Sequence, residues 1–318
     1  MAGLDIIRWN GQPISKPGIY SNIPISIYHG QLTVGPSISS SGLRTIFNAS
    51  AAHYWNHSYL NPAREEQDEK EAFIFGRAAH HLILGEASFR KDFTIRPEQY
   101  PSDAGDKPWN GNSNWCKAWL AQARRDGLTV LTPGQIEAIR GMAAGLNANS
   151  VVRTGILNGL IEHSIVWQDE ETGVWLKVRP DAIPTTDMDF ADLKTAASVD
   201  DNAIEKAIGE RGYHMQGALV AEACRAVFER DLQSFSLVFS EKTRPHVARV
   251  KEIKPGDLSD GAEQNRAALR MFARCLERGE WPGPGGVQTD AEYADLKPFH
   301  RDQALRRLAA LNSELEAA

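Results

Sequence analysis

Residues 179–195 read RPDAIPTTDMDFADLKT, and this stretch carries the strongest indication of the fold. Asp181 closes one apolar segment, and Asp192 and Lys194 stand within the next. Side chains two positions apart on a strand share a face, so Asp192 and Lys194 are expected to project together. Neighbouring carboxylates attract a hard divalent cation, and a lysine beside them can position water or offset charge on a phosphate. The competing interpretation is a surface salt bridge within one strand.

The preceding segments, IEHSIVWQ at 161–168 and VWLKVRPDAI at 174–183, are rich in β-branched and aromatic residues. They flank DEETG and are typical of a hairpin. Pairing Gln168 with Val174 would set Glu162 opposite Pro180, one residue from Asp181. Strict alternation would then point Asp181 to the other face, so a one-residue bulge or a shorter loop is required. Otherwise Glu162 is an ordinary carboxylate at a strand edge.

The remaining elements follow from periodicity, capping residues and turn residues. Thr132 is an expected N-cap with Pro133 in the first turn, and serines precede the helical pattern that starts near residue 39. Helices are expected over 39–55, 65–85, 114–126, 132–148, 200–230, 258–279 and 301–316, strands over 187–195, 235–240 and 246–253, and a loop over 99–114. The order predicts a mixed α/β domain with a central sheet, entered through a β-meander and flanked by helices. We expect one domain over 1–318, with an irregular segment at 1–37, a core at 38–282 and a C-terminal extension at 283–318.

A helix containing GRAAHHLIL, residues 76–84, offers a further candidate ligand. Gly76 and His80 lie on one face of it, and Gly76 would allow a neighbouring element to approach closely. A histidine in such a helix also has a purely structural interpretation. His81 falls about 100° around the helix and is interpreted as a packing residue.

Composition limits the alternatives. The chain has 318 residues, 42% hydrophobic residues and a formal net charge of −6. No apolar run is long enough to span a bilayer, the first residues lack the pattern of a signal peptide, and three cysteines do not indicate a disulfide framework. A reducing cytoplasm is the simplest compartment. The negative net charge counts against nucleic-acid binding. Bound metal ions, however, reverse the sign of the charge at a carboxylate site, and DNA contact needs only a local basic surface.

The motifs together resemble the RecE (exonuclease VIII) family of PD-(D/E)XK nucleases. The similarity spans about residues 18–282, and the short motifs are individually weak but ordered and spaced as in that family. They are GIYSNIPISIYH (18–29), SISSSGLR (37–44), GRAAHHLILGEASFRKDFTIRPEQ (76–99), EHSIVWQDEETG (162–173), RPDAI (179–183), DLKTAAS (192–198), YHMQGAL (213–219) and EWP (280–282).

The resemblance implies a magnesium-dependent exodeoxyribonuclease, with manganese as a substitute, that hydrolyses phosphodiesters of linear double-stranded DNA from its ends, 5′ to 3′. It implies Asp181 and Asp192 as principal metal ligands, completed or tuned by His80 and Glu162, with the Leu193 carbonyl as a further ligand. Lys194 would orient the attacking water. Gln216, with Tyr213 just before it, would contact DNA near the cut. The family's Q-x-x-x-Y pattern fails here because Val220 stands in place of the tyrosine.

The resemblance also implies partners and assembly: a RecT-like single-strand annealing protein, a phage-type recombination system and a tetrameric ring. A shared metal site requires the side-chain ends of His80, Glu162, Asp181 and Asp192 to lie within roughly 8 Å. We expect raised carboxylate pKa values there and a cleft with Gln216 on its wall.

Several other residues have two interpretations each. The helix start with Ser39, Ser40, Ser41 and Arg44 either holds a terminal phosphate or is simply capped. Lys107 and Trp109 either grip a DNA end or cover the core. Lys177 and Arg179 either line a DNA channel or form the solvated face of their strand. Four leucines of the last helix, Leu305, Leu308, Leu311 and Leu315, indicate a core or subunit contact.

Two rival functions remain open. One is a RecB- or Cas4-like nuclease of the same superfamily, although Cas4-like enzymes hold an iron–sulfur cluster on four cysteines and only three exist here. The other is a catalytically silent scaffold subunit that binds DNA ends. Such a subunit would be expected to lose an acidic residue or the lysine, and all are present.

Overall fold

The hairpin around DEETG is present in the computed structural model, which describes residues 4–65, 70–85, 89–103, 105–286 and 289–316. Its strands, β9 (Ser164–Gln168) and β10 (Trp175–Val178), form the centre of a five-stranded sheet. The other strands are β1 (Ile6–Arg8), β2 (Gly18–Ser21) and β3 (Ser37–Ser39), in the order β1-β2-β9-β10-β3. Residues 1–37 were expected to be irregular or short extended structure, and the short strands β1 and β2 lie among them, with buried Ile19 and Tyr20 anchoring β2 to β9.

The hairpin register differs by one residue from the expected one. Gln168 pairs with Trp175, not with Val174, so the loop is longer by one residue. The Asp169 carboxylate accepts hydrogen bonds from both the backbone N–H and the hydroxyl of Thr172, which stabilises this wider turn. The short strands β8 (Leu160–Ile161) and β11 (Ala182–Ile183) continue in the same register, with Ile161 opposite Ala182. Because both strand pairs keep one register, Glu162 stands opposite Asp181 along the backbone without an inserted residue.

A second sheet has the order β12-β13-β14, formed by β12 (Asp189–Ala196), β13 (Ser234–Glu241) and β14 (Ala248–Glu252). The expected meander is wrong here, because β12 does not pair with β10 and runs parallel to β13. Parallel neighbours need a long crossover. It consists of α9 (Asp201–Arg211), α10 (Tyr213–Ala223) and a π-helical turn, Cys224–Phe228. The helix expected over 200–230 breaks at Gly212, which has a left-handed φ of 61°.

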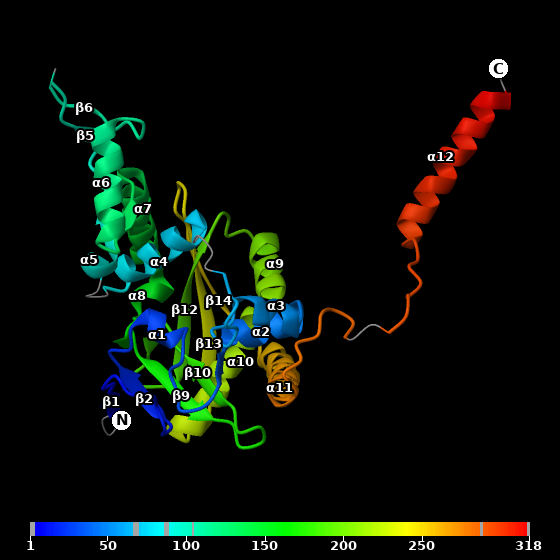
Figure 1. Ribbon diagram of the computed structural model, residues 1–318, viewed down its shortest axis with the longest axis horizontal. Helices are drawn as coiled ribbons and strands as arrows, with labels where there is room; N and C mark the ends of the chain where they lie inside the picture. Colours follow the sequence, from blue (N-terminus) through cyan, green and yellow to red (C-terminus); the bar gives the residue numbers. More distant parts are fainter. Residues whose placement is uncertain (1–3, 66–69, 86–88, 104, 287–288, 317–318) are drawn as a thin grey trace. The chain divides into compact units, whose positions relative to one another are not determined.

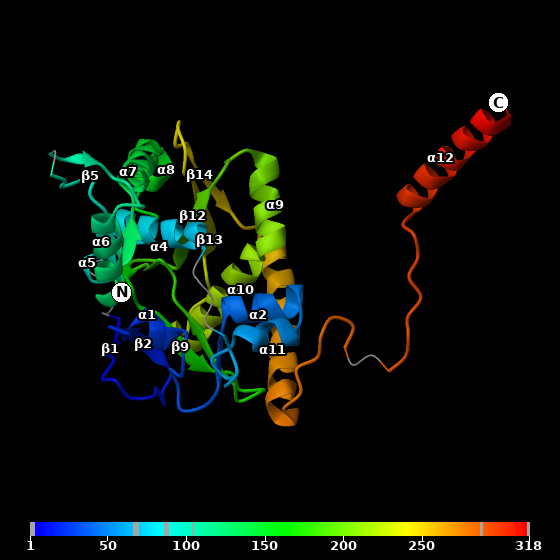
Figure 2. The ribbon, with the colours of Figure 1, turned by 45° about the horizontal axis from the view of Figure 1, so that its top comes forward.

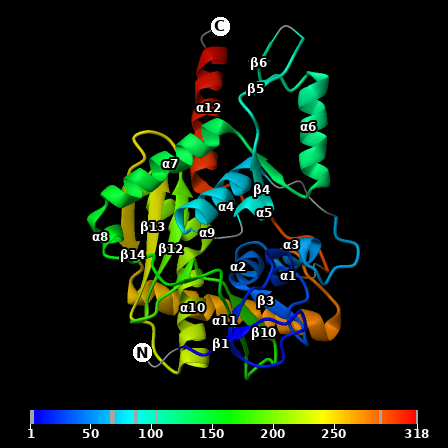
Figure 3. The same cartoon turned by 90° about the vertical axis from the view of Figure 1, so that its left-hand side faces the viewer.

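Two hydrophobic layers cover the faces of the second sheet. On one face, Ala191, Leu193 and Val238 pack with Leu146 of α7 (Pro133–Ala148). On the other face, Phe190, Phe235 and Leu237 pack against α10 and α11 (Pro255–Arg278). Figure 1 and Figure 3 show α7 and α10 on different sides of these strands. The alternation along β12 therefore turns even-numbered residues, including Asp192 and Lys194, toward α10.

The helix start near residue 39 forms two helices, α2 (Ser40–Asn48) and α3 (Ala51–His57), separated at Ala49 and Ser50. Figure 2 shows α2 beside α11, where Leu43 and Ile46 join the same core as Phe272. The serine cap is absent, however. Ser39 occupies the N-cap position, but its hydroxyl makes no cap hydrogen bond and lies 3.0 Å from the Ser41 hydroxyl.

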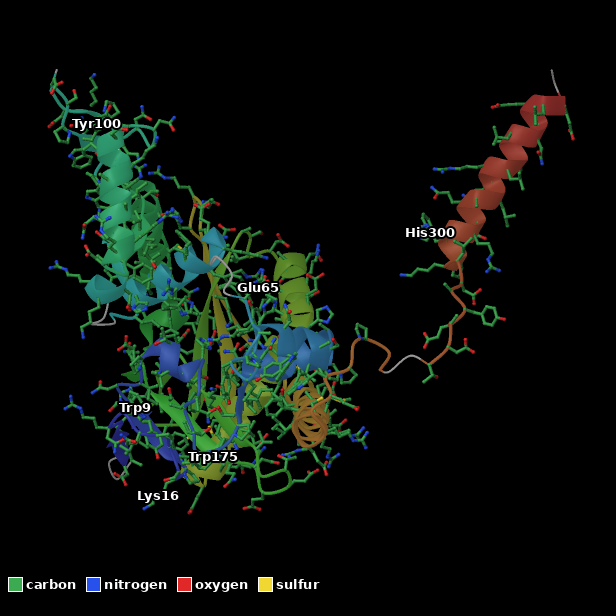
Figure 4. All side chains as sticks on the ribbon, viewed as in Figure 1. Trp9, Lys16, Glu65, Tyr100, Trp175 and His300 are labelled. Atoms are coloured by element: carbon green, nitrogen blue, oxygen red, sulfur yellow. The ribbon has the colours of Figure 1, made fainter. Side chains whose placement is uncertain are left out.

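A helical arm extends from the sheets. Its base joins α4 (Glu71–Ile83) to α7 through Phe75, Phe93, Leu131 and Met142. Its further elements are α5 (Phe89–Asp92), β4 (Phe93–Ile95), β5 (Gln99–Tyr100), β6 (Lys107–Pro108), α6 (Asn114–Arg125), β7 (Thr129–Leu131) and α8 (Ser150–Arg153). Figure 4 labels Tyr100 at the end of this arm and Trp175 in the sheet region. Thr132 and Gln135 form the expected N-terminal cap of α7, a complete capping box.

The chain divides into two units, Met1–Trp281 and Pro282–Ala318. The residues expected to form a C-terminal extension thus make a unit of their own, whose helix is α12 (Pro298–Glu316). Its four leucines are at least 55% exposed. In the described part of the chain, no helix is both long and apolar enough to cross a lipid bilayer.

Candidate active site

Asp192 and Lys194 form an ion pair on the face of β12 that looks toward α10. Asp192 is 4% exposed, so this pair is not the surface salt bridge of the competing interpretation. Burying a charged pair costs desolvation free energy, which is recovered only where further hydrogen bonds satisfy the remaining oxygens and protons.

Gln216 of α10 supplies those hydrogen bonds to both partners. Its amide nitrogen donates to Asp192 Oδ1 at 2.6 Å, and its side-chain oxygen accepts from Lys194 Nζ at 3.1 Å. The next residue, Gly217, explains how α10 comes so close to the sheet. A Cβ placed there would lie 2.6 Å from Cδ1 of Phe235 on β13, so any side chain would push the helix away.

Asp181, the residue directly before β11, also belongs to the site. Its Oδ2 accepts a hydrogen bond from the Leu193 backbone N–H at 2.5 Å, and its Oδ1 lies 3.1 Å from Nδ1 of His80. His80 comes from α4, which packs on β12. A Cβ at Gly76 would meet Oγ1 of Thr195 at 3.7 Å, an ordinary contact, so the expected need for glycine at that position is wrong.

The two aspartates have opposite pKa shifts. Burial, and then the neighbouring Asp181 carboxylate, raise the pKa of Asp192 above its ordinary value. Burial also acts to raise the pKa of Asp181, but attraction and hydrogen bonding from His80 and attraction from Lys194 outweigh it and lower that pKa. Burial acts to lower the pKa of His80, and the charge of Asp181 reverses the effect and raises it. The expectation of raised carboxylate pKa values is therefore confirmed for Asp192 and wrong for Asp181.

Glu162 lies beside Asp181 along the backbone register, but it occupies a left-handed conformation with φ of 61°. This conformation takes its side chain out of the alternation of a regular strand. Within the described residues, no three His, Cys, Asp or Glu side chains are arranged as a ready metal-binding group. The structure thus brings His80, Asp181, Asp192, Lys194 and Gln216 together and leaves the ligand role of Glu162 a prediction.

The residues present fit a hard divalent cation, the type of cofactor that PD-(D/E)XK nucleases generally use. Oδ2 of Asp192 is buried, and the partner that the structure gives it is the ammonium group of Lys194. Burial raises the pKa of Asp192, and repulsion from the carboxylate of Asp181, whose side chain is 13% exposed, raises it further. A cation between the two carboxylates would remove that repulsion and take carboxylate oxygens as ligands. Asp181 and Asp192 would hold it, and the Leu193 carbonyl remains a predicted third ligand.

A cavity of about 140 Å³ lies next to this cluster, with Gln216 and Pro180, the residue before Asp181, on its wall. The expected cleft for a DNA strand stays a prediction. Ser39, Ser40, Ser41, Arg44 and Arg179 also line it. Tyr28 lines it too and stacks near both Arg179 and Lys177, with 4.7 Å and 5.3 Å between the cationic groups and the ring centre. Sequence reasoning missed Tyr28, although it falls within the motif at 18–29. The segment was expected to be irregular, so no strand or helix pattern drew attention to it.

Other candidate DNA contacts have different surroundings. Tyr213 is 8% exposed and lies under Lys194 Nζ, which is 4.4 Å from the ring centre, so Tyr213 supports that lysine. Lys177 is 3% exposed, and the solvated-face interpretation is wrong for it. His81 packs edge-on against Phe93, as expected, with 5.4 Å between ring centres.

Lys107 and Trp109 do not join the cluster. They belong to the outer part of the arm, where Arg96 lies 5.2 Å from the Trp109 ring centre and Trp115 and Trp119 pack edge-on against it. The tryptophan thus completes a small aromatic cluster on the arm. Its role with DNA stays a prediction.

Comparisons with known proteins agree with this geometry. Residues 39–294 match the model of a family described as a PDDEXK-like domain of unknown function (DUF3799). The structure is similar to a crystal structure of a Eubacterium rectale protein proposed to be an exonuclease, with a TM-score of 0.54 and 13% sequence identity over 86% of this chain and 92% of that one. The search of curated proteins found no match. At this identity the structural likeness establishes the fold, and the family model covers most of the chain. The chain therefore belongs to the PDDEXK-like family of unknown function, within the PD-(D/E)XK nuclease superfamily.

Proposed function

We propose that this protein is a magnesium-dependent exodeoxyribonuclease that hydrolyses linear double-stranded DNA, from the 5′ end, in single-strand-annealing recombination. The observation that carries the proposal is the buried cluster in which Asp192 and Lys194 share one face of β12 beside Asp181. The RecE-like order of motifs supports the exonuclease class, the polarity, a RecT-like partner and a ring-shaped tetramer.

The residues of the chain divide the work. Asp181 and Asp192 would bind magnesium, with manganese as a substitute, and the cation would supply charge stabilisation for an in-line phosphodiester hydrolysis. Lys194 holds a positive charge next to these carboxylates, where it can orient the attacking water and stabilise the phosphate. Gln216 fixes the positions of Asp192 and Lys194 relative to each other. His80 fixes Asp181, because a ring nitrogen occupies one of its oxygens.

The decisive experiment compares linear and covalently closed duplexes of the same sequence. Magnesium should permit release of nucleotides from the linear duplex, chelation should stop it, and the closed duplex should persist. Asp192→Asn provides the inactive control. Cleavage of the closed duplex would contradict the exonuclease assignment, and degradation that continues at full rate in Asp192→Asn would contradict the site.

A further inference from the structure

The helix of the second unit, α12, carries its leucines on one side. Leu308, Leu311 and Leu315 fall within a sector of about 60° around the helix axis, given 3.6 residues per turn, and Leu305 borders that sector. All four leucines are at least 55% exposed. Helices in proteins are stabilised mainly by packing of their apolar face. The leucine stripe of α12 is therefore a surface that requires a partner.

The spacing of this stripe is that of a short coiled coil. Ala304, Leu308, Leu311 and Leu315 follow one another at intervals of four, three and four residues. These intervals are those of the d and a positions of a heptad repeat, in which Leu308 and Leu315 are a positions and the other two are d positions. Helices of this kind cover one another by inserting each apolar side chain between four residues of the partner. The leucine stripe therefore fits a second helix with the same pattern.

Charged residues flank the leucine stripe at the g positions, each of which directly precedes an a position. Arg307 precedes Leu308, and Glu314 precedes Leu315. Side chains on one helix interact when they are three or four residues apart. The sequence has no acidic residue at that spacing from Arg307 and no basic residue at that spacing from Glu314. These two charges are therefore suited to a pair between helices.

A parallel arrangement of two α12 helices does not use these charges. In a parallel pair, equivalent positions face each other, so Arg301, the preceding a position, would face its own copy across the interface. Arg307 would lie next to the e position of the other helix, which is the neutral Asn312. Facing arginines repel, and no ion pair compensates for the repulsion.

An antiparallel arrangement matches both the leucines and the charges. Residue numbers then rise along one helix and fall along the other, so a positions face d positions. Leu308 lies against Leu311 of the other helix, and the same alignment places Leu315 against Ala304. It also brings the g positions of the two helices together, with Arg307 of one beside Glu314 of the other. Because such a pair is two-fold symmetric, each of these contacts occurs twice.

We propose that α12 binds the α12 of a second copy of this chain as an antiparallel pair. The pair uses no residue of Met1–Trp281, so it is separate from the cleavage centre and does not rest on the proposed nuclease function. It would link two chains whatever assembly the first unit forms. Since α12 holds only about two heptads, the pair should be weak and should form as the protein concentration rises.

The first test reverses one charge at a time in the full chain. Arg307→Glu makes both g positions acidic, and Glu314→Arg makes both basic, so each variant opposes like charges in its own pair. Arginine and glutamate have similar helix propensities, so the helix itself should persist in both variants. An equimolar mixture of the two variants restores opposite charges at every g contact.

Sedimentation over a series of protein concentrations should show an association step in wild type. Each variant alone should need about 10-fold more protein for that step, the scale of two lost ion pairs and two new repulsions at exposed sites. The mixture should associate as wild type does. Absence of the step in wild type, an unchanged step in both variants, or a mixture no better than its components would overturn the proposal.

The second test determines the orientation of the helices. The native cysteines are buried, so cysteines introduced on α12 are the accessible ones. Ala304→Cys and Leu315→Cys are purified separately and oxidised alone or mixed. The mixture should give a disulfide-linked dimer with one chain of each variant, in several-fold higher yield than either variant alone. Ala310→Cys, on the side away from the leucine stripe, should give no such excess when mixed with Leu315→Cys. A dimer formed mainly by Ala304→Cys with itself would show parallel helices and contradict the pair.

Discussion

His80 Nδ1 lies 3.1 Å from Oδ1 of Asp181, and this contact joins the helical arm to the carboxylate cluster. The relationship is electrostatic as well as geometric, because the charge of Asp181 raises the pKa of His80 against the effect of burial. A group whose pKa is raised on folding stabilises the protein below its unfolded pKa, and this contribution is lost as the pH rises through the folded value.

We therefore expect His80→Gln to destabilise the protein more at pH 6 than at pH 9. The glutamine retains a neutral hydrogen-bond donor. The additional loss of unfolding free energy at pH 6, compared with pH 9, therefore measures the interaction of charged His80 with Asp181. Urea unfolding of both proteins at the two pH values provides the comparison. An equal loss at both pH values would mean that His80 acts on Asp181 without charge.

Asp181→Asn and Asp192→Asn should both reduce metal-dependent DNA cleavage by at least about 100-fold, because each removes a ligand oxygen charge. Their effects on stability should differ in sign. The pKa of Asp181 is lowered by folding, so its charge is stabilising at pH 7, and Asp181→Asn should lower the free energy of unfolding. The pKa of Asp192 is raised, so Asp192→Asn should leave that free energy unchanged or increase it.

Denaturant unfolding in chelator at pH 7 measures this difference without interference from metal. The same direction of change in both variants would contradict the assignment of opposite environments to the two carboxylates.

Lys194→Met should lower turnover by roughly 100- to 1,000-fold, the scale of a lost electrostatic contact in the transition state. The apparent magnesium requirement should change little, because both carboxylates remain. Lys206→Met is a matched control, since that lysine side chain is 70% exposed on α9. A variant with normal turnover and weakened DNA binding would reassign Lys194 to substrate binding.

Lys177→Met should stabilise the protein at pH 7 by up to about 3 kcal/mol, from the difference between 10.5 and about 8 in the pKa of Lys177 at 1.36 kcal/mol per unit. A lowered lysine pKa means that the folded state loses its proton first, so the cost is fully present below pH 8 and disappears between pH 8 and 10.5. The advantage of methionine should therefore shrink over that range in thermal or urea unfolding. A constant or negative difference would show that Lys177 contributes more through its aromatic contacts.

Trp281→Ala should lower the free energy of unfolding by about 2–3 kcal/mol, a typical cost for truncating a partly buried aromatic residue. Trp281 stacks on Trp55 with 4.7 Å between ring centres and also packs against Tyr54 and Phe272. Trp115→Ala on the arm is the comparison, because Trp115 is 38% exposed. A smaller loss for Trp281→Ala than for Trp115→Ala would contradict an anchoring role at the end of the first unit.

The sequence by itself determined the principal helices, the hairpin of β9 and β10, the positions of β12, β13 and β14, and the common face of Asp192 and Lys194. Capping at Thr132, helical periodicity and strand alternation act over a few residues, so they can be recognised without a partner segment. The break at Gly212 was not predicted, although glycine is the residue that most often ends a helix in the left-handed conformation.

Only the tertiary structure decided which strands pair and what surrounds each charge. The parallel pairing of β12 with β13 depends on a crossover that fits over the sheet, and the hairpin register depends on one additional loop residue. The contact between His80 and Asp181, the burial of Lys177 and the uncapped start of α2 all arise where segments distant in the chain meet. Burial and Coulomb interactions depend on distance in space, so the opposite pKa shifts of the aspartates could not be read from local pattern.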